Sequence, residues 1–493
     1  MVAWLCGAAA AQGTFVEADA AVMWSVDGVG GLGWAVAELA DIDGDGAMDV
    51  LTSAPGENTS EGAAYVYSGA TGTLIWRLVE PGGQNQGWGI ADAGDTDGDG
   101  VSDILSGSPR GQGPGFTYLF SGATGALLHT FASPALTLDS FGNAVAAAGD
   151  LNDDGYGDVA IGAPDDASAG FGAGRVYLYS GLDHSLIRAV DGPTVGGLFG
   201  SGLGPIGDVD GDGLPEVVVG ARDDGANAAG RVYVISGADG SILRGPLEGD
   251  PTAAELGAFF VSGVGDVNAD GVDDVYGGDY ADGTSGYGSG KAYVFSGADG
   301  SRIHTFTGAA GDGLGCGRTA RDMDGDGVWD IATGAYLSND GATAAGKVLV
   351  FSGVDGALVR SFTSATPGET FGFDAVGLGD VDGDGDGDLL VGASNASRIY
   401  VMAGNASEPP VETGDTGAPP PPAETGDTGE PPTDDTDDDG CGGCSSSGGG
   451  GLGGVALALA VTRLRRRPWG NCLGRSASPP QRGRGWLEGL HTR

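Results

Sequence analysis

Nine-residue acidic segments recur seven times along the sequence, and their residue types could bind a hard divalent cation. The first begins at Asp41 and the last at Asp380, and successive copies start 54 to 58 residues apart. Each carries Asp or Asn at positions 1, 3 and 5 and a carboxylate at position 9. Calcium takes six to eight oxygen ligands at about 2.3 to 2.6 Å, which alternate short carboxylates in a curled loop can supply. The spacing therefore predicts an array of up to seven calcium sites.

The predicted ligands are the side chains at positions 1, 3, 5 and 9 and the backbone carbonyl at position 7. Position 7 varies freely, as expected where only the backbone coordinates the ion. Loop by loop, the predicted calcium ligands are Asp41, Asp43, Asp45, Ala47 and Asp49; Asp95, Asp97, Asp99, Val101 and Asp103; Asp150, Asn152, Asp154, Tyr156 and Asp158; Asp208, Asp210, Asp212, Leu214 and Glu216; Asp266, Asn268, Asp270, Val272 and Asp274; Asp322, Asp324, Asp326, Val328 and Asp330; and Asp380, Asp382, Asp384, Asp386 and Asp388.

Position 6 is glycine in all seven loops, which indicates a sharp reversal at a positive φ. An EF-hand opens similarly but needs a Glu at position 12 and flanking helices. Position 12 of the first loop is Thr52, and the flanking segments are typical of strands. One Asp-Gly-rich stretch alone would be read as a solvated turn, whereas seven copies favour metal binding. The third and fifth loops are the weakest, because Asn152 and Asn268 replace an Asp.

Short strands must position these loops, and each repeat contains four of them. The third repeat is the clearest: its loop leads into Asp158 to Pro164, and Arg175 to Ser180 is rich in β-branched and aromatic residues. No segment of the repeats shows a sustained 3.6-residue period, so helices are not expected. Four strands repeated at a period above forty residues predict propeller blades. The expected fold is therefore an all-β, seven-bladed β-propeller of four-stranded blades over residues 19–404.

The two ends of the repeat region indicate how the ring closes. The last repeat ends after its third strand, Arg398 to Ala403, and lacks a fourth. The segment Ala20 to Val26 precedes the first loop and matches the pattern of a fourth strand. A last blade built from both ends would remove the open sheet edges.

The residues around the loops resemble a known repeat. Phe141-Gly142 and Gly162-Ala163-Pro164, which flank the third loop, resemble the FG-GAP repeat of integrin α-subunit propellers, and the resemblance covers roughly residues 20–404. It implies a seven-bladed propeller with calcium loops between the first and second strands on one face. The chain departs from that family in having a loop in every repeat and no counterpart of the integrin leg domains. Signalling through a partner subunit is therefore not implied.

Composition excludes several classes of partner and site. The net charge is −46, and the repeats lack the Lys and Arg clusters that nucleic acid and anionic membranes attract. Of five cysteines only Cys316 lies within the repeats, so no disulfide framework is expected. His129, His184 and His304 are assigned to fourth strands of separate repeats, so no catalytic cluster of histidines is predicted. We therefore expect no enzyme.

The termini differ in composition from the repeats. Residues 1–18 begin with an apolar run that predicts a signal peptide, with a frayed apolar terminus as the alternative. Residues 405–440 form an acidic linker rich in Pro, Thr and Gly. In residues 441–467, a cysteine pair, a Gly-rich run, a short apolar segment and an Arg cluster resemble the C-terminal sorting signals of myxobacterial surface proteins; a disordered tail is the alternative, and residues 468–493 are unassigned. These segments predict secretion or display on the outer cell surface, with membrane contact only through the C-terminal tail.

The resulting hypothesis is a calcium-binding recognition or adhesion module that binds a protein or glycan. The expected contact loops join second and third strands, opposite the metal loops, and Arg222, Tyr280 and Tyr336 are the side chains there best able to hold a ligand. These loops are Gly56 to Gly62, Asp165 to Gly172, Asp223 to Gly230, Asp279 to Gly290 and Tyr336 to Gly346. The alternatives are a propeller-based extracellular enzyme acting on polysaccharide, because fold does not determine function, and a structural spacer.

Overall fold

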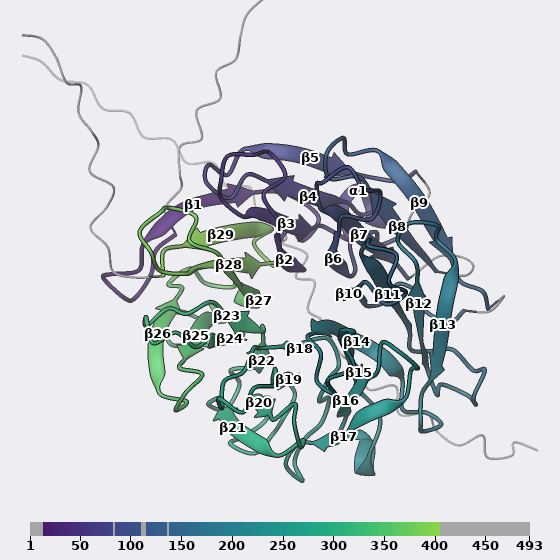
Figure 1. Ribbon diagram of the computed structural model, residues 1–493. Coiled ribbons are helices and arrows are strands. Elements are labelled where there is room, and N and C mark those ends of the chain that lie inside the picture. Colours follow the sequence, from purple (N-terminus) through teal and green to yellow (C-terminus); the bar gives the residue numbers. More distant parts are fainter. Residues whose placement is uncertain (1–12, 82–83, 110–114, 136–137, 405–493) are drawn as a thin grey trace, which may run out of the picture. The chain divides into compact units, whose positions relative to one another are not determined.

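Seven antiparallel sheets form a ring in the computed structural model (Figure 1). The structure describes residues 13–81, 84–109, 115–135 and 138–404. The predicted linker, sorting segment and C-terminal tail lie outside these residues, as do residues 1–12 of the predicted signal peptide. In the described part of the chain, no helix has the length and apolar character needed to cross a membrane.

Each blade runs from an inner strand near the axis to an outer strand at the circumference. From the first blade to the seventh, the strands are β2 (Val36–Leu39), β3 (Asp49–Ser53), β4 (Ala64–Tyr67) and β5 (Leu74–Leu78); β6 (Ile90–Gly94), β7 (Asp103–Ser108), β8 (Phe116–Phe120) and β9 (Leu127–Ala132); β10 (Val145–Gly149), β11 (Asp158–Ala163), β12 (Arg175–Tyr179) and β13 (Leu186–Asp191); β14 (Phe199–Ile206), β15 (Glu216–Ala221), β16 (Arg231–Ile235) and β17 (Ile242–Glu248); β18 (Val261–Gly263), β19 (Val275–Asp279), β20 (Lys291–Phe295) and β21 (Arg302–Thr307); β22 (Leu314–Cys316), β23 (Thr319–Ala320), β24 (Asp330–Ala335), β25 (Lys347–Phe351) and β26 (Leu358–Thr363); and β27 (Phe371–Leu378), β28 (Asp388–Ala393), β29 (Arg398–Met402) and β1 (Val22–Asp27).

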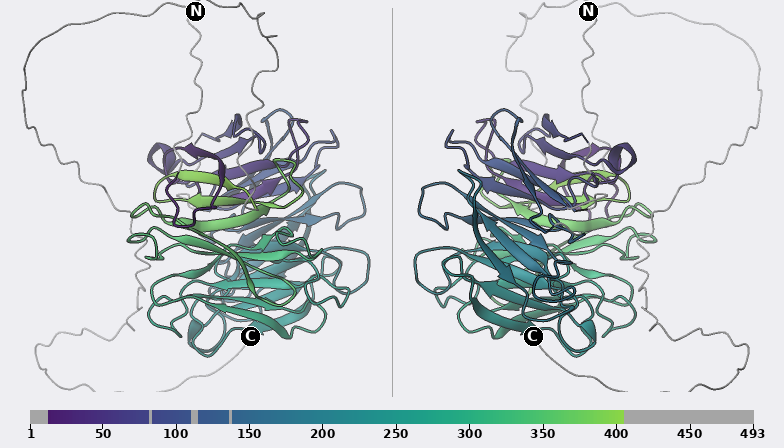
Figure 2. Two further views of the ribbon diagram at one scale, coloured as in Figure 1. Left: turned by 90° about the vertical axis from the view of Figure 1, so that its left-hand side faces the viewer. Right: turned by 90° about the vertical axis from the view of Figure 1, so that its right-hand side faces the viewer.

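The predicted seven-bladed, all-β fold is confirmed. In the sixth blade the inner strand is broken into β22 and β23, and both pieces pair with β24. The only helical segments in the described residues are α1 (Glu57–Ser60) and η1 (Ala226–Ala228), and each contains left-handed residues, so both are turns rather than regular helices. Side views show the strands running between two faces at which the loops gather (Figure 2).

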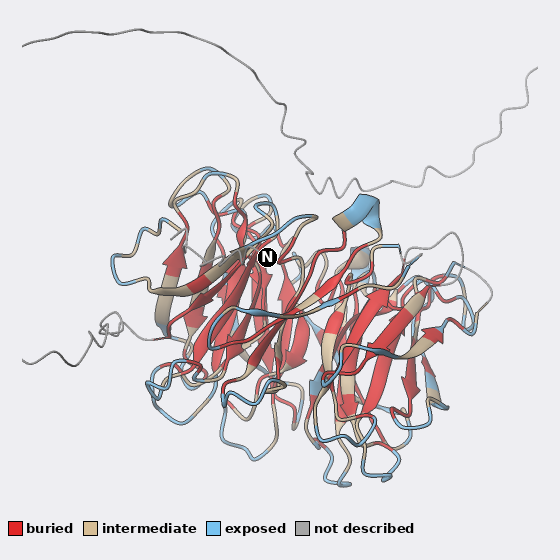
Figure 3. Cartoon of the chain, turned by 90° about the horizontal axis from the view of Figure 1, so that it is seen from above, coloured by how far each residue is buried: buried red, intermediate tan, exposed pale blue. Residues whose placement is uncertain are grey.

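The core lies between neighbouring blades. One buried cluster joins Leu178 of the third blade to Leu203 and Val217 of the fourth, and the other clusters likewise combine consecutive blades. Viewed from above, the strands are mostly buried and the connecting loops mostly exposed (Figure 3). Each sheet is therefore covered on both faces by its neighbours, which explains why the strands β7, β11, β15, β24 and β28 are buried along their whole length.

The Phe-Gly and Gly-Ala-Pro elements hold consecutive blades together. Phe141 is fully buried, while Gly142 adopts a φ of +84°. A Cβ on Gly142 would lie 2.5 Å from the carbonyl oxygen of Phe116 in the second blade. A Cβ on Gly162 would lie 2.2 Å from the carbonyl oxygen of Gly200 in the fourth blade. Phenylalanine thus fills the space between blades, and the glycines allow the backbones to approach.

The N-terminal strand closes the ring, as predicted. Strand β1 pairs antiparallel with β29, in a register that includes Val26 opposite Ile399 and Asp27 opposite Arg398. The closing junction repeats the glycine contact of the other blades, because a Cβ on Gly392 would lie 2.2 Å from the carbonyl oxygen of Gly33. The last blade therefore has its fourth strand from the opposite end of the domain, and this strand pairs the edge of β29.

Residues 13–18, which fall within the predicted signal peptide, pack onto the sixth and seventh blades. The backbone N–H of Val16 donates to the carbonyl of Thr363 at 2.9 Å, and the Glu17 carboxylate accepts the Thr363 N–H at 2.7 Å. The Phe15 ring lies edge-on to Phe371 and Tyr400, with ring centroids 5.2 and 5.8 Å apart. The packed domain thus begins before residue 19, and this segment fastens β26 to the closing blade.

Candidate metal-binding loops

All seven acidic loops lie at one face of the propeller. Each follows the inner strand of its blade and ends at the start of the second strand, as the loop from Asp41 to Asp49 does between β2 and β3. The inner strands all run in the same direction, so the loops emerge on the same side of the ring (Figures 1 and 2). The structure therefore has the arrangement that the FG-GAP resemblance implied.

The position 1 carboxylate curls each loop around itself. In the first loop one oxygen of Asp41 accepts the Gly44 N–H at 2.7 Å and the other accepts the Gly46 N–H at 2.8 Å. The position 6 glycines have φ between +88° and +103°, and a Cβ there would meet no atom within 4 Å. Glycine is needed at position 6 because the backbone there is left-handed, and not because a side chain would lack space. The loop is thus preshaped by its own backbone, because the carboxylates at positions 1, 3 and 5 of the first loop all accept N–H groups of that loop.

The position 9 carboxylate joins each loop to the core of its blade. Asp49 is fully buried, and its two oxygens accept the N–H groups of Ile42 at 2.9 Å and of Gly69 at 3.1 Å. Burial raises the pKa of Asp49 to about 6, with a further contribution from Asp43 and Asp45. The repulsion between these like charges is what a bound divalent ion would relieve.

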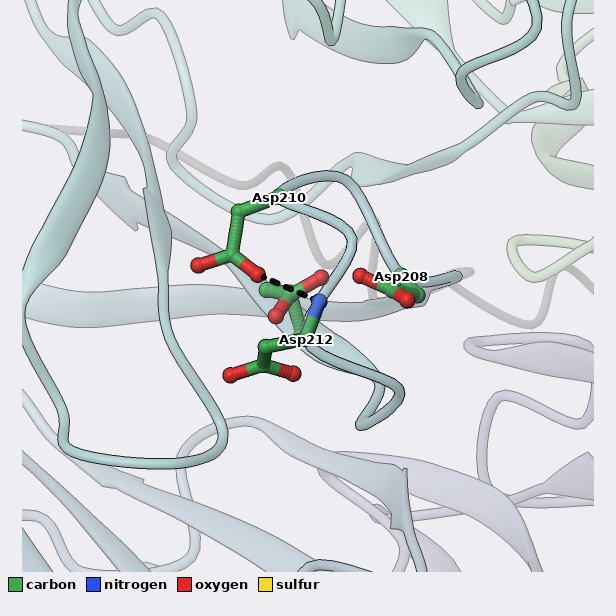
Figure 4. A group of neighbouring side chains, drawn as sticks. Asp208, Asp210 and Asp212 are labelled. Atoms are coloured by element: carbon green, nitrogen blue, oxygen red, sulfur yellow. Dashed lines mark hydrogen bonds between the residues drawn. The ribbon is translucent and has the colours of Figure 1, made fainter.

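The fourth loop brings four carboxylates together (Figure 4). One oxygen each from Asp208, Asp210, Asp212 and Glu216 lies within 4.8 Å of the others. Glu216 accepts the Val209 N–H at 2.7 Å through one carboxylate oxygen, whereas its other oxygen is buried and has no hydrogen-bond partner in the described structure. Burial raises the pKa of Glu216 to about 7, and the three aspartates add to the shift. An unpaired, buried oxygen within an all-oxygen donor set fits a hard cation.

The other loops vary in how closely they gather their oxygens. Three carboxylates converge in each of the first, second, sixth and seventh loops. In the third and fifth loops, the amide oxygens of Asn152 and Asn268 each accept the N–H of the position 5 aspartate at 2.9 Å. Position 4 of these two loops is Asp153 or Ala269, at φ of +64° and +60°, where glycine stands in the other five. The two Asn loops therefore have fewer carboxylates among their ligands. In addition, their position 4 residue has a left-handed backbone, which costs conformational free energy for a residue other than glycine.

The opposite face carries a connected set of aromatic side chains, which we call the aromatic rim. Trp34 precedes β2 and Tyr336 follows β24, so both lie at the strand ends away from the metal loops. The rim consists of Trp34, Trp88, Phe259, Tyr280, Tyr336 and Phe373, all partly exposed. Trp34 lies 4.7 Å from Trp88 and 5.0 Å from Phe373 between ring centroids. The contacts continue from Phe373 through Tyr336 and Tyr280 to Phe259, across five blades.

Part of this face was predicted from the sequence. Tyr280 and Tyr336 belong to the rim, and the Tyr280 hydroxyl donates to Glu255 at 2.5 Å. The Arg222 side chain is 42% exposed and lies 3.9 Å from Asp223, away from the rim contacts. The tryptophans and Phe373 were missed, although each follows the Gly of the FG position or its equivalent. That shared position is the signal that could have identified them.

One prediction about the histidines was wrong. His184 lies in the turn before β13, not in a fourth strand, and adopts a φ of +62°. Its ring lies 4.0 Å from that of His129, in β9 of the preceding blade. The strand assignment was wrong because residue 184 occupies a position in the turn between the third and fourth strands, where the corresponding turns of the other blades have glycine. At this turn His184 contacts His129 across the junction between two blades.

Comparison with known proteins identifies the repeats. The family model described as "FG-GAP repeat" matches residues 32–67, 141–179, 199–235 and 373–402. Integrin alpha-4 of Xenopus laevis is 34% identical over 190 residues, 35% of this chain, and integrin alpha-8 of Gallus gallus is 31% identical over 42% of it. The alignments cover 18% and 20% of those relatives, so this chain spans only a small part of their length.

A solved structure of BBS1N in complex with ARL6DN contains a chain with a TM-score of 0.49 and 12% sequence identity to this protein. The match covers 78% of this chain and 97% of the solved chain.

The FG-GAP matches fall on the first, third, fourth and seventh blades. Blades two, five and six have the same strand order and acidic loops. The seven-bladed β-propeller therefore carries FG-GAP repeats in four of its blades, and part of the chain is similar to integrin α subunits.

Proposed function

We propose that this propeller is a calcium-loaded recognition module that acts outside the cell or on its surface. Calcium would bind in up to seven loops on one face, and a protein or glycan ligand would bind at the other. The observation that carries the metal part is the fourth loop, where four carboxylates converge and one buried Glu216 oxygen lacks a partner. Its all-oxygen donor set favours calcium over the transition metals, which prefer nitrogen or sulfur ligands.

Calcium would act on stability rather than on chemistry. The loop carboxylates repel one another, and their position 9 members are buried at the base of each blade. An ion that binds only the native loop stabilises the fold by an amount that rises with its concentration, about 2.7 kcal/mol per site at 100 times the dissociation constant. The loaded loops would then hold the ends of the inner and second strands and fix the opposite face.

The aromatic rim supports the second part of the proposal. Partly exposed tryptophan and tyrosine rings supply contact area with little side-chain entropy to lose, and such residues are enriched among those that dominate the binding energy of protein interfaces. The rim residues come from five blades, so the closed ring is needed to assemble them. Similarity to integrin α subunits is consistent with an extracellular recognition role.

A binding screen tests this proposal. The full chain in millimolar calcium would be applied to protein and glycan arrays, alongside the double variant Trp34→Ala/Phe373→Ala. Leu74→Ala, at an exposed outer-strand position of the first blade, serves as the control. We expect hits that the rim variant loses and the control retains, and that chelator weakens. Equal binding by all three proteins would place the ligand site elsewhere, and an absence of any ligand would favour a spacer.

A further inference from the structure

Hydrogen bonds between outer strands and neighbouring turns repeat around the ring, and we call each one a latch. In six of the seven blades, a large side chain near the middle of the outer strand donates to the carbonyl oxygen of a glycine in the next blade. This glycine belongs to a Ser-Gly pair in the turn between the third and fourth strands, except for the last, Gly404, at the end of the domain. The six latches are Trp24 to Gly69 at 2.6 Å, Trp76 to Gly122 at 2.7 Å, Arg188 to Gly237 at 2.7 Å, Arg244 to Gly297 at 2.6 Å, His304 to Gly353 at 2.7 Å and Arg360 to Gly404 at 2.8 Å.

A second glycine, three residues further along the turn, makes room for the latch. A Cβ on Gly72 would lie 2.8 Å from the Trp24 ring, and one on Gly356 would lie 3.0 Å from the His304 ring. Both glycines have positive φ, at +67° and +71°. The donor side chain of the outer strand therefore packs against a glycine with positive φ, and from there it reaches the carbonyl oxygen of the first glycine in the turn.

The junction between the second and third blades lacks its latch. His129 stands at the donor position of β9, and within the described chain it makes no hydrogen bond to the carbonyl of Gly181. The place of the second glycine is taken by His184, at a φ of +62°. The two imidazoles lie against each other in a tilted arrangement, with centroids 4.0 Å apart and planes inclined by 36°. The Nδ1 atom of His184 is buried and has no partner in the described structure.

The surroundings of the pair offer limited compensation for positive charge. Phe131 of β9 packs against His129 at 4.7 Å and against Tyr179 of β12 at 4.9 Å. The titratable groups around the two rings are Tyr179, the more distant Asp139 beyond it, and Asp183, which adjoins His184 and whose carboxylate accepts the Ser185 N–H at 2.9 Å. Burial lowers the pKa of His129, and the charge on His184 lowers it further. The Asp183 carboxylate can balance the positive charge of one protonated imidazole. A second protonated imidazole would be repelled by the first, because the two ring centroids are only 4.0 Å apart.

We propose that the junction between the second and third blades is an acid-sensitive joint, at which protonation of the stacked pair His129 and His184 loosens the contact between the two blades. In the folded chain, burial and the adjacent imidazole of His184 favour the uncharged form of His129. Its contribution to stability is therefore complete above the unfolded histidine pKa of about 6.5 and is lost as pH falls below it. The His304 latch responds differently, because a protonated imidazole still donates to the Gly353 carbonyl.

Hydrogen exchange of the full chain tests the joint. In saturating calcium at pH 7.5 and 5.5, corrected for intrinsic rates, we expect acid to increase exchange in β9 and in the turn before β13 more than at the matched junction of β21 and the turn before β26. An open histidine with a pKa of about 6.5 is mostly protonated at pH 5.5, so one histidine that stays uncharged in the closed pair shifts the opening equilibrium by about tenfold between the two pH values.

Two variants separate the joint from general acid effects. His184→Gly restores the glycine of the other turns and lets His129 form a latch, so the excess exchange at pH 5.5 should disappear. His129→Phe keeps a stacked ring without a second charge and should also remove the excess. The proposal is overturned if both junctions respond equally to acid in the native chain, or if the excess at the second junction persists in both variants.

Discussion

Replacing Trp24 with alanine should weaken the ring at the point where its two ends meet. Trp24 lies in β1, is 9% exposed, and packs in the cluster that joins the seventh blade to the first. Its indole N–H also donates to the Gly69 carbonyl at 2.6 Å. Removing a buried tryptophan side chain destabilises proteins by about 3–5 kcal/mol, because both the transferred surface and a cavity are lost. Loss of the hydrogen bond accounts for about 0.5–1.5 kcal/mol of a change of this kind.

A matched substitution distinguishes ring closure from the loss of one tryptophan. Trp76 makes the same hydrogen bond, to Gly122, between two blades that are covalently continuous. Trp24→Ala should therefore lower the urea midpoint more than Trp76→Ala, and should promote aggregation by freeing the edge of β29. Trp24→Phe keeps most of the packing and isolates the hydrogen bond. Unfolding followed by far-UV circular dichroism, with light scattering for association, gives both readouts. Equal midpoints for the two alanine variants, with the Trp24 variant still monomeric, would refute closure by β1.

The remaining predictions concern the loops, the blade contacts and the tail. In the metal-free fold, the pKa values of the position 9 carboxyls are raised to about 6 for Asp49 and about 7 for Glu216 and Asp388, above their unfolded values near 4. The stability of the protein in chelator should therefore fall as pH rises from 4 to 7, and calcium should reverse the loss. Melting scans at several pH values, with and without calcium, check this sign. Gly142→Ala should destabilise the fold by more than about 1 kcal/mol, because it combines backbone strain with a 2.5 Å approach to the Phe116 carbonyl. Gly196→Ala, at a similar φ of +80° with no atom within 4 Å, should show the strain alone. Similar denaturation midpoints for the two variants would contradict the packing argument. Truncation after Gly440 should release the propeller into the medium if residues 441–467 are a sorting segment, and identical partitioning of the truncated and full-length chains would leave the disordered-tail alternative.

Features fixed by local chemistry could be predicted from the sequence. The acidic loops were found because seven copies share positions 1, 3, 5, 6 and 9, and the strands follow directly from them. The partner of β1 was predicted because the last repeat lacks a fourth strand after Arg398. In each case the signal lies in one repeat or in a comparison between repeats, so no three-dimensional information was required.

Features that depend on contacts between blades were missed. The aromatic rim joins Trp34 to Phe373 across the closing junction, and these residues are more than 300 positions apart in the sequence. The pairing of His129 with His184 was missed because His184 was placed in a strand, although alignment with Gly125 marks it as a replaced turn glycine. Propensity and periodicity describe one strand at a time, whereas these contacts are set by the closed ring.

The number of calcium ions bound per chain is the direct test of metal binding by the acidic loops. The full chain, dialysed against calcium and then against metal-free buffer, would be measured by elemental analysis together with protein concentration. We expect several calcium ions per chain, up to seven, which EDTA removes with a fall in melting temperature. The third and fifth loops, with Asn152 and Asn268, should lose theirs first. A calcium content near zero, with the same melting temperature in EDTA and in millimolar calcium, would contradict the account.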